Sequence, residues 1–119
     1  MIELHLPWPP SVNHTYKRGR YGNVYLNPKV SDYRLGVLAA CRIQGHAGKR
    51  MNDRLAVDVQ CWQPKRMSKV DVGNLDKCLM DALTHARVWL DDEQIDDVRY
   101  RRCGKDKDGM VIVTIKEVE

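Results

Sequence analysis

Carboxylates gather in one part of the sequence, between Asp71 and Asp97. This segment holds eight acidic and two basic residues, a balance of −6, whereas the rest of the chain holds 18 bases and eight acids, a balance of +10. Carboxylate oxygens are the ligands that Mg²⁺ prefers, and a basic body around them suits a protein that holds a polyanion. An acidic surface loop on a basic protein has the same composition. Charge alone therefore leaves both interpretations open.

Within that segment, four polar residues recur at spacings of three and four, which places them on one face of a helix. They are Asn74, Lys77, Asp81 and His85. Asp71 precedes this helix, and Asp91 and Asp92 follow it. These carboxylates and a lysine could converge on Mg²⁺, with water and phosphate oxygens as the remaining ligands. The metal would activate water for phosphodiester hydrolysis, and the lysine would orient that water or stabilise the leaving oxygen.

The same residues also admit structural roles that need no ligand. Asp71 can cap the helix, and Lys77 with Asp81 can form a surface ion pair worth roughly 0.2–0.5 kcal/mol. Residues 91–93 can form a solvated turn. A zinc site is not indicated, because the four cysteines and four histidines are scattered without ligand spacing. Single cysteines within apolar patterns indicate small buried residues in a reducing compartment.

Two basic stretches are candidates for binding nucleic acid. The first pairs phosphate-binding charges with aromatic faces on which bases can stack, and the second leads directly into Asp71. A solvated loop explains each stretch equally well alone, and their occurrence beside the acidic segment favours nucleic acid. The residues expected to contact DNA strands are Tyr16, Lys17, Arg18, Arg20, Lys65, Arg66 and Lys69.

The elements that must position these residues follow from apolar periodicity. Alternation predicts strands at residues 2–6, 55–61, 98–103 and 110–115. Spacings of three and four predict two helices, one that begins at Pro28 and ends near residues 45–48 and one over residues 75–86. A basic loop or hairpin with a short strand at 23–26 should precede the first helix, and residues 104–109 should form a charged hairpin loop. The pattern predicts one α+β domain over residues 1–119, with two helices on one mostly antiparallel or mixed sheet.

The sequence contains no apolar run near the ~20 residues that cross a bilayer. Its first residues also lack the basic start and long apolar stretch of a signal peptide. We therefore expect a cytoplasmic protein without a membrane partner.

Four short motifs, taken in order, carry a resemblance to a known family. They are LPWPPSVN from Leu6, DVGNLDK from Asp71, DAL from Asp81 and WLDD from Trp89. In order and spacing they resemble the RusA family of Holliday-junction resolvases over essentially the whole chain. The resemblance implies a bacterial endonuclease, often encoded by a phage or prophage, that uses Mg²⁺ and no organic cofactor. Such an enzyme cuts four-way DNA junctions by paired nicks during recombination and repair.

The resemblance also assigns roles to individual residues. The metal-site aspartates of the family fall on Asp71 and Asp92, with Asp91 beside the latter, and the essential lysine falls on Lys77. Two asparagines within the motifs join the expected DNA contacts; they are Asn13 and Asn74.

The resemblance further implies a homodimer, whose two-fold symmetry would match that of a four-way junction. An apolar edge strand is a possible source of the interface. It is expected near Val111, Val113 and Ile115.

One position departs from the family pattern. Gly73 stands where the pattern D-x-D-N has its second aspartate, so one expected ligand is missing. Water or a backbone carbonyl could fill the position, Asp76 or Asp81 could substitute, or the protein could bind junctions without cutting them well. Asp81 is the better substitute, because it shares the helix face of Asn74 and Lys77. The hypotheses are therefore a junction endonuclease, a non-catalytic junction-binding protein, and an RNA-binding α+β module.

Overall fold

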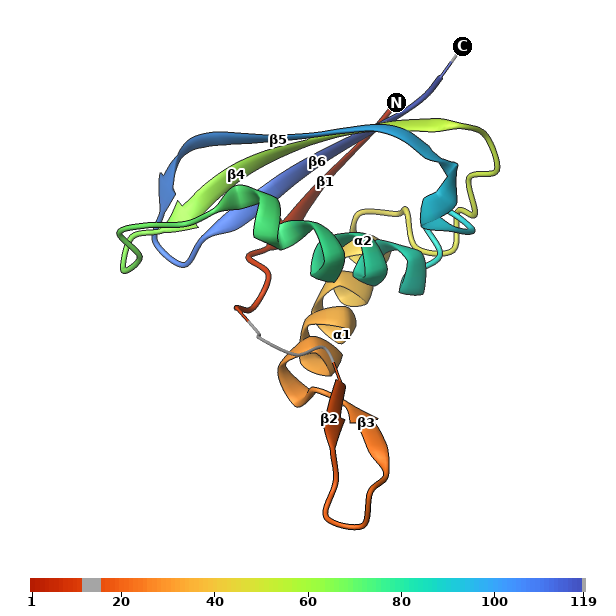
Figure 1. The fold of residues 1–119 in the computed structure, drawn as a ribbon. Helices are drawn as coiled ribbons and strands as arrows, with labels where there is room; N and C mark the ends of the chain where they lie inside the picture. The colour runs from red at the N-terminus through yellow and green to blue at the C-terminus, as the bar shows by residue number, and fades with distance from the viewer. Residues whose placement is uncertain (12–15, 119) are drawn as a thin grey trace.

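A computed structural model describes residues 1–11 and 16–118 of the chain as a four-stranded sheet, a two-stranded ribbon and two α-helices (Figure 1). In chain order the elements are β1 (Ile2–Pro7), β2 (Tyr16–Arg18), β3 (Val24–Leu26), α1 (Pro28–Ile43), β4 (Leu55–Pro64), the 3₁₀ helix η1 (Val72–Leu75), α2 (Asp76–His85), the 3₁₀ helix η2 (Asp92–Gln94), β5 (Ile95–Asp106) and β6 (Met110–Glu117). The predicted α+β class is confirmed.

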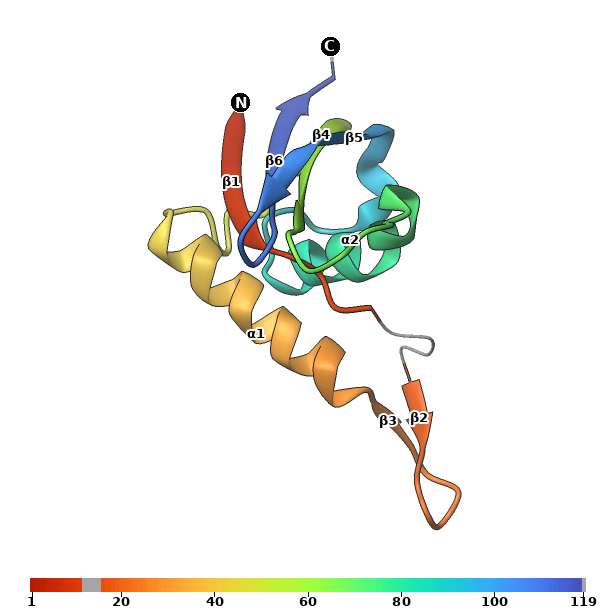
Figure 2. The ribbon, with the colours of Figure 1, turned by 90° about the vertical axis from the view of Figure 1, so that its left-hand side faces the viewer.

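The main sheet is mixed, with the strand order β1-β6-β4-β5. β6 pairs antiparallel with both β1 and β4, whereas β4 and β5 run parallel. Apolar residues alternate with polar ones along β1 and β4, so one face of the sheet is apolar. Both helices cover that face (Figures 1 and 2).

Two predictions about the last two strands were wrong. β5 and β6 do not form a hairpin, because β4 lies between them. β6 is also not an edge strand, since Val111, Val113 and Ile115 are fully buried between β1 and β4. Alternation identifies which side chains face the core, but it says nothing about which strands are neighbours. These three residues therefore form the core rather than a dimer interface.

The first helix begins at a local signal and is fixed to the end of β1. The side chain of Asn27 accepts a hydrogen bond from the Lys29 backbone N–H at 3.1 Å, and Pro28 occupies the first turn. Val37 is fully buried on the inner face. The Tyr33 hydroxyl donates to the Pro7 carbonyl at 2.8 Å, which places the end of β1 beside the helix.

The second helix begins one residue later than expected, at Asp76, after the η1 turn. Its core face carries the predicted apolar residues, with Leu79 and Leu83 fully buried. Trp89, which follows α2, is also fully buried, and its Nε1 donates to Thr84 Oγ1 at 2.7 Å. None of the helices in the described part of the chain is long and apolar enough to cross a membrane.

The β2–β3 ribbon extends away from the sheet and helices (Figures 1 and 2). Its strands pair antiparallel, from Tyr16 opposite Leu26 to Arg18 opposite Val24. This confirms a hairpin in the segment that the sequence marks as basic and aromatic.

Candidate functional site

Asp71 is exposed at the turn that leads into α2. Its Oδ1 accepts a hydrogen bond from the Gly73 backbone N–H at 3.0 Å, and its backbone carbonyl accepts one from the Asn74 N–H at 3.1 Å. Within residues 1–11 and 16–118, no protein group bonds its second carboxylate oxygen, Oδ2. The predicted cap is therefore present, and it leaves one oxygen for another ligand.

Arg102 of β5 holds the loop that precedes Asp71. Its Nη2 donates to the Val70 carbonyl at 2.5 Å, and its Nη1 donates to Gln63 Oε1 at 3.1 Å. The Gln63 side chain in turn donates to the Met67 carbonyl at 3.0 Å. Sequence reasoning missed Arg102, because partners 32 and 39 residues away leave no local spacing signal.

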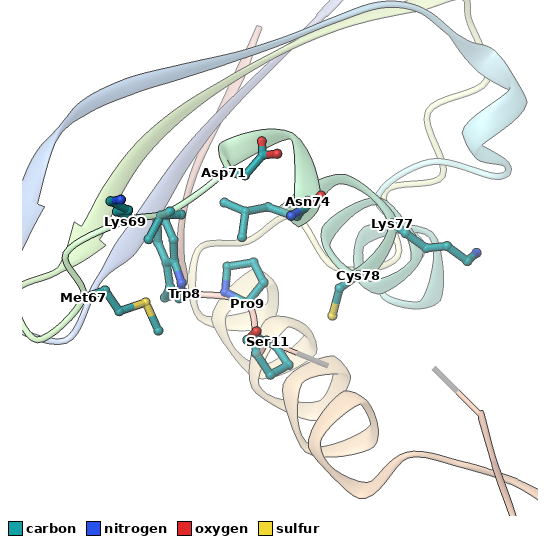
Figure 3. A pocket seen from close by; sticks show the side chains of 12 residues that line it. Trp8, Pro9, Ser11, Met67, Lys69, Asp71, Asn74, Lys77 and Cys78 are labelled. Carbon is teal, nitrogen blue, oxygen red and sulfur yellow. The ribbon is translucent and has the colours of Figure 1, made fainter. Parts of the chain in front are cut away.

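A cavity of about 650 Å³ lies beside Asp71. One side is polar and includes Asp71, Asn74 and Lys69, and the other side is formed by Trp8 and the prolines after it (Figure 3). Figure 3 shows the Lys77 side chain leaving this cavity on the side away from Asp71. The cavity therefore offers a carboxylate, an amide and an amine on one side and an indole with proline rings on the other.

Lys77 forms an ion pair with Asp81 one turn further along α2. Its Nζ donates to Asp81 Oδ2 at 3.0 Å, and Arg34 Nη2 of α1 lies 3.9 Å from the same oxygen. The hydrogen bond to Asp81 and the attraction of that carboxylate raise the pKa of Lys77. Lys77 is therefore a cation near neutral pH and can stabilise negative charge, but it cannot act as a base.

Asp91 and Asp92 occupy different environments although they are adjacent. Asp91 Oδ1 accepts from the Glu93 N–H at 3.1 Å, and the Gln94 side chain accepts from the Asp91 N–H at 2.8 Å, which completes a capping box. The Glu93 N–H and a hydrogen bond from Asp92 lower the pKa of Asp91. That same hydrogen bond, burial and the charges of Asp91 and Asp81 raise the pKa of Asp92, against the attraction of Lys77.

Two long-range anchors hold the turn that carries Asp92. Gln94 is buried, and its Nε2 donates to the Met51 carbonyl at 2.8 Å and the Asp53 carbonyl at 2.9 Å. Arg54 bonds Glu93 Oε1 at 3.0 Å and forms an ion pair with Asp96. The spacing of Gln94 three residues after Asp91 was a usable capping-box signal that the sequence reasoning did not take up.

A second cavity, of about 250 Å³, lies on the other side of Lys77. Asp76, Asp81 and Asp92 line it together with Lys77. Asp76 accepts a hydrogen bond from the Tyr100 hydroxyl at 2.6 Å, so one of its oxygens is engaged. Asp81 uses only Oδ2 for its two cations, which leaves Oδ1 free of protein partners among the described residues.

The structure therefore brings some of the predicted ligands together and leaves others apart. Asp92 and Asp81 face one cavity, whereas Asp71 faces the other, and η1 and η2 lie toward opposite ends of α2 (Figure 1). Lys77 borders both cavities. In the part of the chain that is described, no three acidic, histidine or cysteine side chains form a group that could hold a metal ion.

Gly73 has room for a side chain. Its φ lies outside the left-handed region, so its backbone does not require glycine. A Cβ at this position would lie 3.3 Å from Asp71 Oδ1, a tight contact that a small shift of the Asp71 carboxylate relieves. A carboxylate at position 73 would therefore lie beside Asp71.

The predicted DNA contacts lie in three places. Lys69 and Asn74 line the larger cavity, and Lys65 and Arg66 are exposed in the adjoining loop. The β2–β3 ribbon carries the others, which are Tyr16, Lys17, Arg18 and Arg20. Tyr16, at the base of the ribbon, lines a further cavity of about 340 Å³ with Asp81 and Asp92. Asn13 lies outside the described residues.

The chain was also compared with known proteins. The family model described as endodeoxyribonuclease RusA matches residues 7–116. A crossover junction endodeoxyribonuclease of Enterobacteria phage 82 is 35% identical over 117 residues, covering 95% of this chain and 92% of the relative. Relatives with the same description from Escherichia coli strain K12 and Shigella sonnei are each 36% identical over 115 residues, covering 95% of this chain and 92% of theirs.

These matches span the motifs, the cavity beside Asp71 and both ends of α2. They confirm the resemblance that the four motifs carry. The chain belongs to the RusA family of endodeoxyribonucleases.

Proposed function

We propose that this protein is a Mg²⁺-dependent endonuclease that resolves four-way DNA junctions by paired nicks in recombination and repair. The observation that carries the proposal is the place of Lys77, a cation that borders the Asp71 cavity and the Asp92 cavity. The relatives described as crossover junction endodeoxyribonucleases indicate the substrate class.

The donor chemistry of the site fits Mg²⁺, which needs only one or two carboxylates besides water and phosphate oxygens. At the smaller cavity, Asp92 would hold an ion with Asp81 Oδ1 as a further donor from α2 and Asp91 beside Asp92. At the larger cavity, Asp71 Oδ2 would be the carboxylate ligand. When bound, Mg²⁺ supplies water activation and charge neutralisation for phosphodiester hydrolysis.

The protein's own groups bind the strand and stabilise charge. Lys69, at the wall of the larger cavity, and Arg66 in the adjoining loop would hold backbone phosphates. Lys77 would exchange Asp81 for the scissile phosphate, where a preorganised cation stabilises the charge that develops in the transition state. Asp81 thereby holds the ammonium group in place until substrate arrives.

A homodimer is part of this proposal, because paired nicks need two sites related by the symmetry of the junction. Sedimentation of the protein alone and with a junction measures the stoichiometry, and one protomer per junction would contradict the dimer. We also propose that the protein acts in the cytoplasm of a bacterium and is encoded by a phage or prophage. Its relatives come from a phage and from enterobacteria.

A second candidate function is junction binding without efficient cleavage. Gly73 favours it, together with the lack of a three-carboxylate group in the described part of the chain. RNA binding is the third candidate.

One experiment separates these functions. The wild type and Asp92→Asn are incubated with a labelled four-way junction, a linear duplex of the same sequence and a stem-loop RNA, each with Mg²⁺ and with EDTA. Symmetric nicking of the junction that needs both Mg²⁺ and Asp92 supports the enzyme. Tight junction binding without nicks supports the binding protein, and a preference for RNA contradicts both.

A further inference from the structure

The β2–β3 ribbon is an exposed arm. All residues of β2 and the first two of β3 are exposed, and the arm extends away from the sheet and helices in both views (Figures 1 and 2). A two-stranded ribbon without a core beneath it has marginal stability in water. An arm of this kind is therefore best explained by a partner that covers it.

The turn at the end of the arm has a defined shape. The Gly19 N–H donates to the Asn23 carbonyl at 2.6 Å, and the Gly22 N–H donates to the Gly19 carbonyl at 3.1 Å. Gly22 has a φ of +81°, and a Cβ on Gly19 would lie 2.3 Å from Asn23 Oδ1. The left-handed φ favours glycine at position 22, whereas a side chain at position 19 would have to displace the Asn23 amide. The turn presents Tyr21 with 91% of its surface exposed.

The charge of the arm selects the class of partner. Residues 16–26 contain three basic residues, three tyrosines and no acidic residue. A positive ribbon with aromatic side chains complements a nucleic acid. The phosphates attract the lysine and arginine side chains, and the tyrosine rings can stack on exposed faces of nucleobases. The arm also begins near the candidate site, because Tyr16 lines a cavity with Asp92.

We propose that Tyr21 stacks on a base face at the branch point of the DNA and thereby makes binding selective for junctions. The inference rests on the proposed function. A continuous duplex has no open base face, whereas the arms of a four-way junction end at base pairs whose outer faces can be uncovered. Lys17, Arg18 and Arg20 hold phosphates in either substrate, so they add affinity without selecting the branch point. Tyr21 acts only where a face is open.

The test compares junction and duplex binding in EDTA, where no cleavage occurs. We expect Tyr21→Ala to weaken junction binding by about 5- to 150-fold and to leave duplex binding unchanged, because that is the range for loss of one base–aromatic stack. Tyr21→Phe keeps the ring and should bind as the wild type does. Tyr25→Ala is the matched control, since Tyr25 is an exposed tyrosine within a strand of the same arm.

A fluorescent base analogue beside the branch point gives a second readout. Wild type and Tyr21→Phe should quench its emission, whereas Tyr21→Ala should not. An unchanged junction-to-duplex affinity ratio in Tyr21→Ala overturns the inference. So does a loss of protein self-association in that variant, measured by sedimentation, because the partner of the arm would then be a second copy of the chain.

The same measurements distinguish this inference from the function on which it rests. A wild type that binds junction and duplex equally contradicts the proposed function itself. A wild type that prefers junctions, together with Tyr21→Ala that keeps the same preference, overturns only the role of Tyr21.

Discussion

Replacing Gly73 by aspartate is the sharpest test of the candidate metal site. The backbone at position 73 accepts a side chain, and the new Cβ would lie 3.3 Å from Asp71 Oδ1. The variant Gly73→Asp therefore adds a carboxylate beside Asp71 without rebuilding the turn. We expect it to bind Mg²⁺ more tightly and to cut junctions faster at limiting Mg²⁺.

The expected size follows from the exposure of Asp71 and Gly73. In water, a divalent cation and a carboxylate about 4 Å apart attract each other by about 2 kcal/mol, and salt reduces this value. We therefore expect the Mg²⁺ dissociation constant to fall by about 5- to 30-fold. Without Mg²⁺ the net effect on the free energy of unfolding should be near zero. Repulsion between the two carboxylates destabilises the native state by about 1 kcal/mol. The helix dipole offsets this, because it stabilises an acid in the first helical turn by about 0.3–1 kcal/mol.

The assay is urea unfolding over a Mg²⁺ series, with junction cleavage measured on the same samples. Ligand binding to the native state raises the free energy of unfolding, so tighter binding moves this rise to lower Mg²⁺ concentration. Gly73→Asn is the matched control, because it has the same size and no charge. An equal response of Gly73→Asp and Gly73→Asn to Mg²⁺ would refute the metal site beside Asp71.

Three further predictions concern single side chains. Lys77→Met should lower the cleavage rate at least 100-fold while junction affinity changes little, because one preorganised charge stabilises a transition state by about 2.7–4 kcal/mol. A larger effect on affinity than on rate would contradict this role of Lys77. The raised pKa of Asp92 means that the metal-free native state binds more protons than the unfolded chain, so its ionised form opposes folding above that pKa. Asp92→Asn should therefore raise the urea midpoint at pH 7 in EDTA, and the gain should shrink as the pH falls through the acid range; a lower midpoint at pH 7 would contradict this. Arg102→Met should lower the free energy of unfolding by about 1–3 kcal/mol, because it removes two charged hydrogen bonds. It should also lower the cleavage rate, because the loop before Asp71 then loses its anchor. Unchanged cleavage with reduced stability would limit Arg102 to a structural role.

Local signals predicted much of the fold. Both helices, the cap at Asp71 and the ribbon follow from spacing, turn residues and composition over short stretches, and the structure contains all of them. The neighbours of each strand could not be predicted in the same way. Val111 opposes Leu6 on one side and Cys61 on the other, and these pairings join distant parts of the sequence.

The candidate site likewise combines local features that could be predicted with long-range features that could not. The face shared by Lys77 and Asp81 was predictable, because the two residues are one helical turn apart. The contact of Arg34 in α1 with Asp81 could not be predicted from local spacing. The same holds for the hydrogen bond of Gln94 to the Met51 carbonyl 43 residues away. The separation of Asp71 from Asp92 by α2 is also a property of the crossover between two parallel strands. Sequence spacing suggested that they converge, but it contains no information about the path of that crossover.

The inner position of β6 has a consequence for the order of assembly. Both of its neighbours, β1 and β4, precede it in the chain, so a growing polypeptide presents them to each other without the strand that belongs between them. Ile2 meets its partner Ile115 only after almost the entire chain has been made. Because long-range pairings form late, the sheet beneath α2 cannot close around an early fragment. A ribosome-bound chain that stops before β6 would therefore carry every candidate catalytic residue and still lack the surface that holds them in place.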